Sequence, residues 1–418
     1  MQTAMASLYS LLSQLQAQVA ALHVWTSRLK LFGPEKPKVV IVGAGPGGLN
    51  AARGLNGHAD VTIIDGKDYH ELNSGTLQTF VAPHQHKKVL IDYEDIPDIG
   101  RMVKGRVLAV HEDHVTVDNG ALTGPWDLAY EWLILAPGST YAEGPIKAFC
   151  HSLEERQNII QQEHARLRSA TRILIIGGGI VGVELAGEVL SKMPNKKITL
   201  LTSGERLIAD KPAEIGVAAK DHLERQGVEI HVNTRASKNA DGVYSTADGR
   251  SFDAEIVYMT VGGKPNTDFL KGGLVPLNTK GFIEVTECLQ VKGYHNIYAV
   301  GDATDIKETK LGYLAAAHGR LTAMNLRRRF RYGDAAEQQV WIPFGGFEFV
   351  TGEAMMFTLG RPDGVAHASL MARLKRMGRD GWFSGWLRAK EKYTVTTRQN
   401  LGVPELEPVA IANPKAGA

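Results

Sequence analysis

Cysteine is nearly absent from this chain of 418 residues, in which only Cys150 and Cys288 occur. Two cysteines so far apart form no CxxC pair, so we expect no disulfide framework, no cysteine-ligated metal and no vicinal redox dithiol. Long apolar runs are also missing: no stretch reaches the roughly 18 uninterrupted apolar residues that a membrane-spanning helix needs. The 47 basic and 45 acidic side chains leave a net charge of +2, which gives no reason to expect nucleic-acid binding.

The rest of the composition is that of an ordinary globular chain. Hydrophobic residues make up 44% and charged residues 22%, and the length suggests two or three domains at roughly 100–200 residues each. Basic residues are nevertheless concentrated near one end, because residues 320–398 hold 14 lysines and arginines against 7 acids. Such a surplus favours contact with an acidic surface, either an anionic membrane or an acidic protein.

The two ends of the chain differ from the part between them. Residues 1–34 place Leu8, Leu12, Leu15 and Val19 at helical spacing, which predicts an amphipathic helix. A secretory signal is not indicated, since no charged segment precedes a continuous apolar core. The helix is either a membrane anchor or a targeting segment that is later removed, and the sequence leaves both open. Residues 404–418 are rich in proline and are expected to form a flexible tail.

A strand, a glycine turn, a helix and a second strand follow one another between residues 38 and 65. The turn carries Gly43, Gly45 and Gly48 in GxGxxG spacing. Gly43 allows the tight turn, Gly45 lets backbone amides approach a pyrophosphate, and Gly48 lets the helix and strand pack closely. Asp65 ends the second strand, where its carboxylate can accept hydrogen bonds from ribose hydroxyls. This unit predicts dinucleotide binding.

The same unit recurs between residues 172 and 201. Its turn carries three glycines at the same spacing: Gly177, Gly179 and Gly182. After its second strand, Glu205 could bind the ribose of NADH, or Arg206 the 2′-phosphate of NADPH, and the sequence does not choose. Glu184, on the first helical turn, is predicted to reach the nicotinamide side of the nucleotide.

Two further motifs lie at strand ends and add to the two glycine turns. Gly138 follows an apolar strand at 133–135, and Gly301-Asp302 ends a strand at 296–300. Together with a glycine-rich turn at 262–263, the motifs occur in an order that resembles the two-dinucleotide-domain flavoprotein disulfide reductase superfamily over residues 38–330. The resemblance implies FAD binding by Gly43, Gly45, Gly48, Asp65, Gly138, Gly301 and Asp302. It implies NAD(P)H binding by Gly177, Gly179, Gly182 and Glu184.

The missing cysteine pair separates the subfamilies. Disulfide reductases and sulfide:quinone oxidoreductases use paired cysteines near the flavin. Segments 310–318 and 359–365 instead resemble the ferroptosis-suppressor and apoptosis-inducing-factor-like family of flavin-dependent NAD(P)H:quinone oxidoreductases, related to type II NADH dehydrogenases. The resemblance implies that Lys310, Tyr313 and His318 lie near the flavin and quinone, with Leu314 beside the cofactor. Arg388 is a departure, since the family has a lysine there.

These patterns predict an α/β fold with two Rossmann-like dinucleotide-binding domains and a C-terminal α+β region. The FAD-binding domain is expected to be discontinuous, at 38–145 and 280–340, with the NAD(P)H-binding domain inserted at 146–279. Residues 341–403 are expected to contact a membrane or quinone or to form a homodimer, because tryptophans and basic residues are interleaved between 373 and 392.

The expected function is hydride transfer from NADH or NADPH to FAD, followed by reduction of a quinone or another small acceptor. The expected location is peripheral to a membrane, on its cytosolic face or in mitochondria, and not secreted. Two alternatives stay open: a reductase of a ferredoxin or rubredoxin, and an apoptosis-inducing-factor-like interaction protein switched by its redox state. A monooxygenase is disfavoured, since its fingerprint between the two glycine motifs is missing.

Overall fold

The computed structural model describes residues 35–141, 144–239, 242–334 and 336–341, with Arg398, residues 401–403 and the backbone of strands 355–358 and 364–367. The elements named below belong to the second of two units into which the chain divides, Lys38–Ala418. The helix expected at 1–34, the basic and aromatic stretch at 373–392 with Arg388, and the tail at 404–418 lie outside the described residues. Within the described residues no helix is long and apolar enough to cross a membrane.

A parallel sheet in the order β19-β9-β1-β2-β5 is the centre of what we call the first half, residues 38–141 and 264–341. Its strands are β1 (Lys38–Val42), β2 (Asp60–Asp65), β5 (Arg101–Lys104), β9 (Trp132–Leu135) and β19 (Ile297–Ala299). The β-branched run of β1 is buried after its first residue, as expected for a central strand covered on both faces. β19 returns from far along the chain to pair with β9, so this half is discontinuous in sequence.

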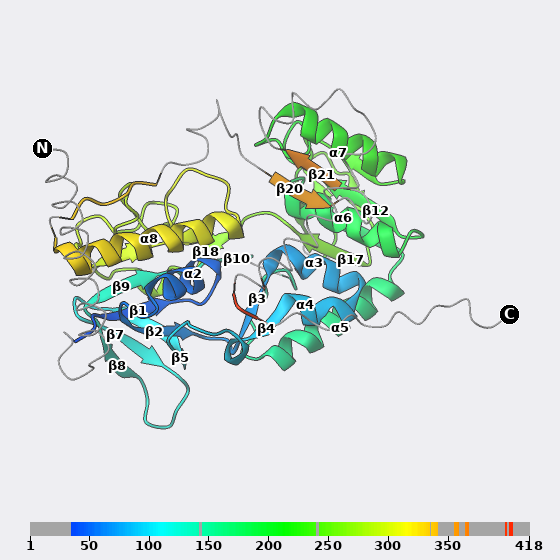
Figure 1. Ribbon diagram of the computed structural model, residues 1–418. Coiled ribbons are helices and arrows are strands. Elements are labelled where there is room, and N and C mark those ends of the chain that lie inside the picture. The colour runs from blue at the N-terminus through cyan, green and yellow to red at the C-terminus, as the bar shows by residue number, and fades with distance from the viewer. Residues whose placement is uncertain are drawn as a thin grey trace, which may run out of the picture. The chain divides into compact units, whose positions relative to one another are not determined.

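Helices α2 (Pro46–Leu55) and α8 (Gly312–Tyr332) pack against each other in the first half (Figure 1). A Cβ atom on Gly319 of α8 would overlap the carbonyl oxygen of Gly47, so the two helices meet at backbone contact. The two helices begin at Pro46 and Gly312. Proline fits the first helical position because the amide that it lacks would have no helical partner there.

A second parallel sheet, in the order β13-β12-β11-β17, is the centre of the second half, residues 172–263. Its strands are β11 (Arg172–Ile176), β12 (Lys197–Leu201), β13 (Glu229–His231) and β17 (Ile256–Met259). Its helices are α6 (Ile180–Lys192) and α7 (Ala213–Arg225). The two βαβ units expected from the glycine motifs are therefore both confirmed.

Each half also contains an antiparallel three-stranded sheet that sequence analysis did not predict. The first half has β6 (Arg106–Val110), β7 (His114–Asp118) and β8 (Trp126–Ala129). The second half has β14 (Ala236–Lys238), β15 (Tyr244–Thr246) and β16 (Ser251–Phe252). Each of these sheets precedes a strand that rejoins the parallel sheet, β9 or β17. The two halves thus repeat one topology well beyond their glycine turns.

Helix α5 (Leu153–Ser169) joins the halves, and β10 (Ser139–Thr140) pairs antiparallel with β18 (Lys264–Pro265) where the chain leaves and re-enters the first half. Ser152 caps α5 by accepting a hydrogen bond from the Glu155 amide.

The other elements are β3 (Tyr69–Glu71), α3 (Asn73–Val81), α4 (His86–Val89), β4 (Leu90–Asp92), β20 (Met355–Thr358), β21 (Gly364–His367) and the 3₁₀ turns at Pro83–Gln85, Tyr93–Asp95, Asp268–Leu270 and Gly301–Ala303.

Candidate functional site

The first glycine turn is tight for reasons visible in its backbone. Gly43 has a φ of 100°, and a Cβ atom there would overlap the carbonyl oxygen of Ala136. A Cβ atom on Gly48 would overlap the carbonyl oxygen of Gly43. At Gly45, by contrast, no heavy atom lies within 4 Å of where a Cβ would be. The space beside Gly45 is therefore open, at the amino end of α2, whose first amides have no carbonyl partner within the helix.

Three side chains brace this turn at Ala44. The Ala44 amide donates to Asp65 Oδ2 at 2.7 Å, and the Lys67 amide donates to Asp65 Oδ1 at 2.9 Å. The Ala44 carbonyl lies 3.1 Å from His70 Nδ1 and accepts from Tyr93 Oη at 3.4 Å. Burial, and then the nearby Lys67, lower the pKa of His70 to about 4, so the ring is neutral and donates from Nδ1.

The second glycine turn repeats this geometry with different neighbours. Gly177 has a φ of 133°, and a Cβ atom on Gly182 would overlap the carbonyl oxygen of Gly177. Space beside Gly179 is open, as it is at Gly45. The Gly178 carbonyl accepts a hydrogen bond from the Ile208 amide at 2.7 Å, so a backbone loop takes the place of the histidine.

The two residues between which the sequence did not choose are placed very differently. The Glu205 side chain is 81% exposed. The guanidinium of Arg206 is turned back on its own loop, where it donates to three backbone carbonyls. Glu184 is buried in α6.

A cavity of about 240 Å³ opens where the two halves meet at the β10–β18 pair. Residues of the first half and of the segments that join the halves supply most of its wall, and Gly263 of the second half completes it. It is lined by Ser139, Thr140, Tyr141, Lys147, Gly263, Phe282, Asp302 and Lys310. The Gly138 turn, with a φ of 68°, leads directly into this wall. Two predicted site residues, Asp302 and Lys310, are thus brought together.

The carboxylate of Asp302 joins a hydroxyl and an ammonium group of the cavity wall. Its Oδ2 accepts from Ser139 Oγ at 2.6 Å and lies 3.1 Å from Lys147 Nζ. Burial alone would raise the pKa of Asp302, but the charge and hydrogen bond of Lys147 and the Ser139 hydroxyl lower it below its ordinary value. Asp302 is therefore an anion held between a hydroxyl and an ammonium group.

Lys310 adds a second cation to the same wall. Its Nζ donates to the Thr304 and Ile306 carbonyls at 2.8 and 3.0 Å, and it lies 5.6 Å from the centre of the Phe282 ring. Burial lowers the pKa of Lys310. With Lys147 and Lys310 against Asp302, the charged groups of the wall sum to a positive charge.

His318 lies behind this wall rather than in it. Its Nδ1 accepts a hydrogen bond from the Gly301 amide at 3.1 Å. Nε2 lies 2.9 Å from Glu308 Oε1, although the two are not aligned for a hydrogen bond. His318 thus fixes the Gly301-Asp302 turn. Its helix neighbours Tyr313 and Leu314 are half-buried and buried, respectively, in the first turn of α8.

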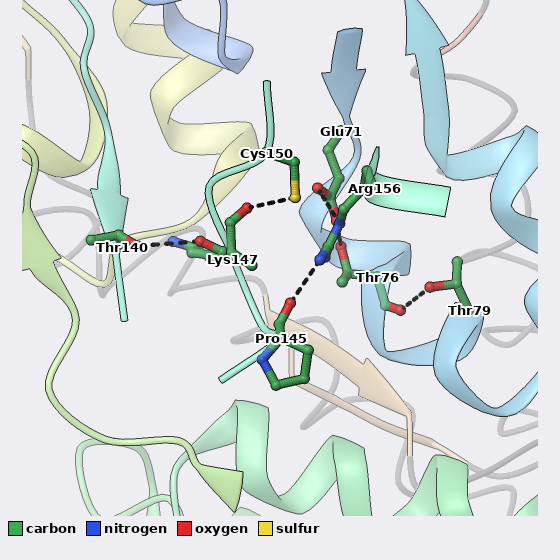
Figure 2. Close-up of polar contacts among 9 residues, drawn as sticks. Glu71, Thr76, Thr79, Thr140, Pro145, Lys147, Cys150 and Arg156 are labelled. Carbon is green, nitrogen blue, oxygen red and sulfur yellow. Dashed lines mark hydrogen bonds and ion pairs between the residues drawn. The ribbon is translucent and has the colours of Figure 1, made fainter. Parts of the chain in front are cut away.

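A buried ion pair supports the loop that carries Lys147 (Figure 2). Arg156 of α5 donates from Nε and Nη2 to the two oxygens of Glu71 at 3.0 and 2.8 Å. Its Nη1 donates to the Pro145 carbonyl at 2.8 Å, and Thr76 Oγ1 donates to Glu71 Oε1 at 2.6 Å. Lys147, two residues beyond Pro145, has a φ of 53°, which non-glycine residues adopt only when their surroundings fix it.

The residues present fit two dinucleotides. The open cradles at Gly45 and Gly179 lie over helix N-termini and could take a pyrophosphate without displacing a side chain. The cavity adds hydroxyl, carboxylate and ammonium groups at the junction between the halves.

Comparison with known proteins agrees with this geometry. The family described as pyridine nucleotide-disulphide oxidoreductase matches residues 37–321. The chain belongs to this family. It is therefore an NAD(P)H-dependent flavoprotein oxidoreductase, and its cofactors are FAD and NADH or NADPH.

The chain is similar to several curated proteins. Ferroptosis suppressor protein 1 of Homo sapiens is 30% identical over 360 residues, covering 81% of this chain and 92% of that protein. Apoptosis-inducing factor homolog A of Dictyostelium discoideum is 29% identical over 316 residues, covering 69% and 76%. Among solved structures, the NADH-bound water-forming NADH oxidase of Lactobacillus brevis superposes with a TM-score of 0.61 at 20% identity, covering 82% and 78%, which shows a shared fold.

Several residues in or beside this cavity were missed by sequence reasoning. Ser139 adjoins the predicted Gly138 turn, so its position was available. Lys147 and Phe282 belong to no motif, and only the fold brings them to Asp302. The Arg156–Glu71 pair left no signal either, because its partners are 85 positions apart.

Proposed function

We propose that this protein is an FAD-dependent NAD(P)H:quinone oxidoreductase. The observation that carries the proposal is the cavity, which both halves line and which holds Lys147, Asp302 and Lys310. When bound, FAD accepts a hydride at N5 from the nicotinamide and supplies electrons to the acceptor. The similarity to ferroptosis suppressor protein 1, together with the lack of a cysteine pair, supports a quinone rather than a disulfide as that acceptor.

The first half would hold the flavin. Gly43, Gly45 and Gly48 would cradle the pyrophosphate, and Asp65 would bind the ribose. Asp302 and the Gly138 turn would hold the flavin end, with Leu314 packed beside it. Lys147 and Lys310 would stabilise negative charge on the reduced ring, because cations in a water-poor site interact strongly with developing charge.

The second half would hold the nicotinamide nucleotide. Gly177, Gly179 and Gly182 would cradle its pyrophosphate, Glu205 would reach the ribose, and Glu184 would lie toward the nicotinamide. His318 would act on the flavin through the Gly301-Asp302 turn that it holds, and Tyr313 would lie on the acceptor side at the start of α8.

A long-tailed quinone dissolves in the bilayer, so we also propose peripheral contact with a membrane surface. The basic surplus at 320–398 supports this proposal through attraction to anionic headgroups. Sedimentation of the full chain with vesicles would test it. The expected result is binding to vesicles with anionic lipid that weakens as salt is raised. Equal recovery with neutral vesicles or with none would contradict it.

The central experiment separates flavin reduction from acceptor use. FAD-loaded protein is first reduced anaerobically by NADH, and a short-chain ubiquinone is then mixed in while flavin absorbance is followed. Rapid reoxidation, far above the rate with oxygen alone, is expected. Lys310→Met should slow this step, because a cation near the reduced ring is lost, whereas Lys292→Met, outside the cavity, should not. A flavin that NADH bleaches but quinone does not reoxidise would overturn the proposal and favour a protein acceptor.

A further inference from the structure

NADPH differs from NADH by a 2′-phosphate on the adenosine ribose. A site that accepts NADPH normally offers that phosphate a cation just beyond the second strand of its dinucleotide-binding unit. In this chain the second strand is β12, and Arg206 is the first cation after it. Whether Arg206 is available therefore bears directly on which nucleotide is used.

In the structure the Arg206 guanidinium binds carbonyls of its own loop. Its Nη1 donates to the Ile208 carbonyl at 3.0 Å, and its Nη2 donates to the Ala209 and Lys211 carbonyls at 2.8 and 2.7 Å. A guanidinium with these three acceptors would have to leave backbone carbonyls without a partner in order to turn toward a ligand, which is unfavourable. Arg206 is also mostly covered, with its side chain 24% exposed.

The loop that Arg206 holds is the brace of the second glycine turn. Ile208 has a φ of 50°, an unusual value for a β-branched residue, and its amide donates to the Gly178 carbonyl. A Cβ atom on Gly216 of α7 would overlap the Leu207 carbonyl oxygen, so the helix packs directly on this loop. Arg206 thus shapes the nucleotide site from behind instead of binding the nucleotide.

The exposed residues that directly follow β12 in the chain are not cationic, although Arg206 Nε lies 3.9 Å from Glu205 Oε1. The Gly204 amide donates to Thr202 Oγ1 at 3.2 Å, which turns the chain outward. Ser203 and Glu205 are then exposed, Glu205 by 81%. A carboxylate there can accept hydrogen bonds from the two ribose hydroxyls of NADH but repels a 2′-phosphate.

We infer that this site selects NADH over NADPH, with Glu205 as the specificity residue and Arg206 as a positioning residue for the glycine turn. The inference rests on the proposed placement of the nicotinamide nucleotide in the second half. Arg235 is the cation that would favour NADPH instead. It is exposed, and it follows Thr234, whose amide donates to the Thr202 carbonyl just after β12 at 2.8 Å. Its role must therefore be measured separately.

The test uses FAD-loaded full-length protein and two readouts. Calorimetry compares ADP-ribose with 2′-phospho-ADP-ribose, and anaerobic flavin bleaching compares NADH with NADPH. We expect at least about tenfold preference for the unphosphorylated ligand in both. Glu205→Arg should reduce this preference at least about tenfold. Asp221→Arg, an exposed change of the same charge on α7, should leave it unchanged.

Three results would overturn the inference. They are equal binding of the two ligands by the unaltered protein, a Glu205→Arg variant that keeps the full preference, and an Arg235→Met variant that selectively loses the phosphorylated ligand. Arg206→Met should weaken both ligands alike and lower the melting temperature. Because neither readout needs a quinone, a protein that prefers NADH but reduces no quinone would support this inference and refute the proposed acceptor.

Discussion

The two halves of the molecule use the same glycine turn but support it in different ways. In the first half the carbonyl of Ala44 is held by the side chains of His70 and Tyr93. In the second half the carbonyl at the matching position, Gly178, is held by the backbone amide of Ile208. Buried side chains from distant segments fix one turn, and a local loop beside the surface fixes the other.

This difference fits the proposed placement of the flavin in the first half and of the nicotinamide nucleotide in the second. A flavin that stays bound through many turnovers is best served by a turn fixed inside the core, where His70 is 2% exposed. A nucleotide that enters and leaves in each cycle needs a turn whose support can relax without opening the core. The first half should therefore lose its ligand only when its packing is broken, whereas the second half should lose affinity gradually.

The largest effect is expected from the third glycine of each turn. Gly48→Ala places a methyl group against the Gly43 carbonyl, and Gly182→Ala does the same against Gly177. We expect Gly48→Ala to be purified without flavin, because both strand and helix must move. Gly182→Ala should keep its flavin absorbance and lose bleaching by NADH. Absorbance spectra of the purified variants before and after NADH measure both.

Gly45→Ala is the matched control for this pair. Its added methyl meets no protein atom within 4 Å, so the melting temperature of the FAD-free protein should be unchanged while FAD affinity falls. If Gly48→Ala retained a full complement of FAD, the close approach of helix and strand would not matter for binding, and the comparison of the turns would fail.

A smaller effect is expected where α5 is anchored to each half. Arg156 ties the helix to Glu71 of the first half, and Glu163, on the same face of the helix, accepts from Tyr258 Oη of the second. Arg156→Met leaves a buried carboxylate unpaired and should lower the free energy of unfolding by about 3–5 kcal/mol. Tyr258→Phe removes one hydrogen bond and should cost about 1–3 kcal/mol. Urea denaturation measures both.

The double variant Glu71→Leu with Arg156→Met tests whether the unpaired buried charge causes the loss of stability. Removing both charges should restore much of the stability that Arg156→Met loses, because no charge is then left buried. The Pro145 carbonyl would still lack its donor, so weakened contact between Lys147 and Asp302 should persist and appear as a changed flavin spectrum. A double variant no more stable than Arg156→Met would show that the loss comes from packing and not from charge.

Local signals in the sequence predicted the structural features that the two halves share. Glycine spacing, β-branched strands and strand-end acids identified both βαβ units and the turn after β19 that carries Asp302. Parts that depend on distant contacts could not be predicted. The three-stranded sheets consist of strands of only two to five residues, which are too short to be told from loops by their pattern. His70 and Lys147 gain their roles only when the fold brings Ala44 and Asp302 beside them.

The pH dependence of the two turns gives the smallest and most selective test. The pKa of His70 is lowered from 6.5 to about 4 by burial, so the unfolded chain binds its proton first as pH falls. Stability from neutral His70 is therefore complete above about pH 6.5 and is lost progressively toward pH 4, by about 3 kcal/mol at most. FAD release should rise over that window. His70→Gln should flatten this dependence and also weaken the turn.

The second turn is the control, because Ile208 has no titrating side chain. ADP-ribose binding, measured by calorimetry on protein that still holds its flavin, should therefore change little between pH 6.5 and 5. Parallel loss of both ligands over that range would mean that one global transition, and not the brace at Ala44, governs acid sensitivity.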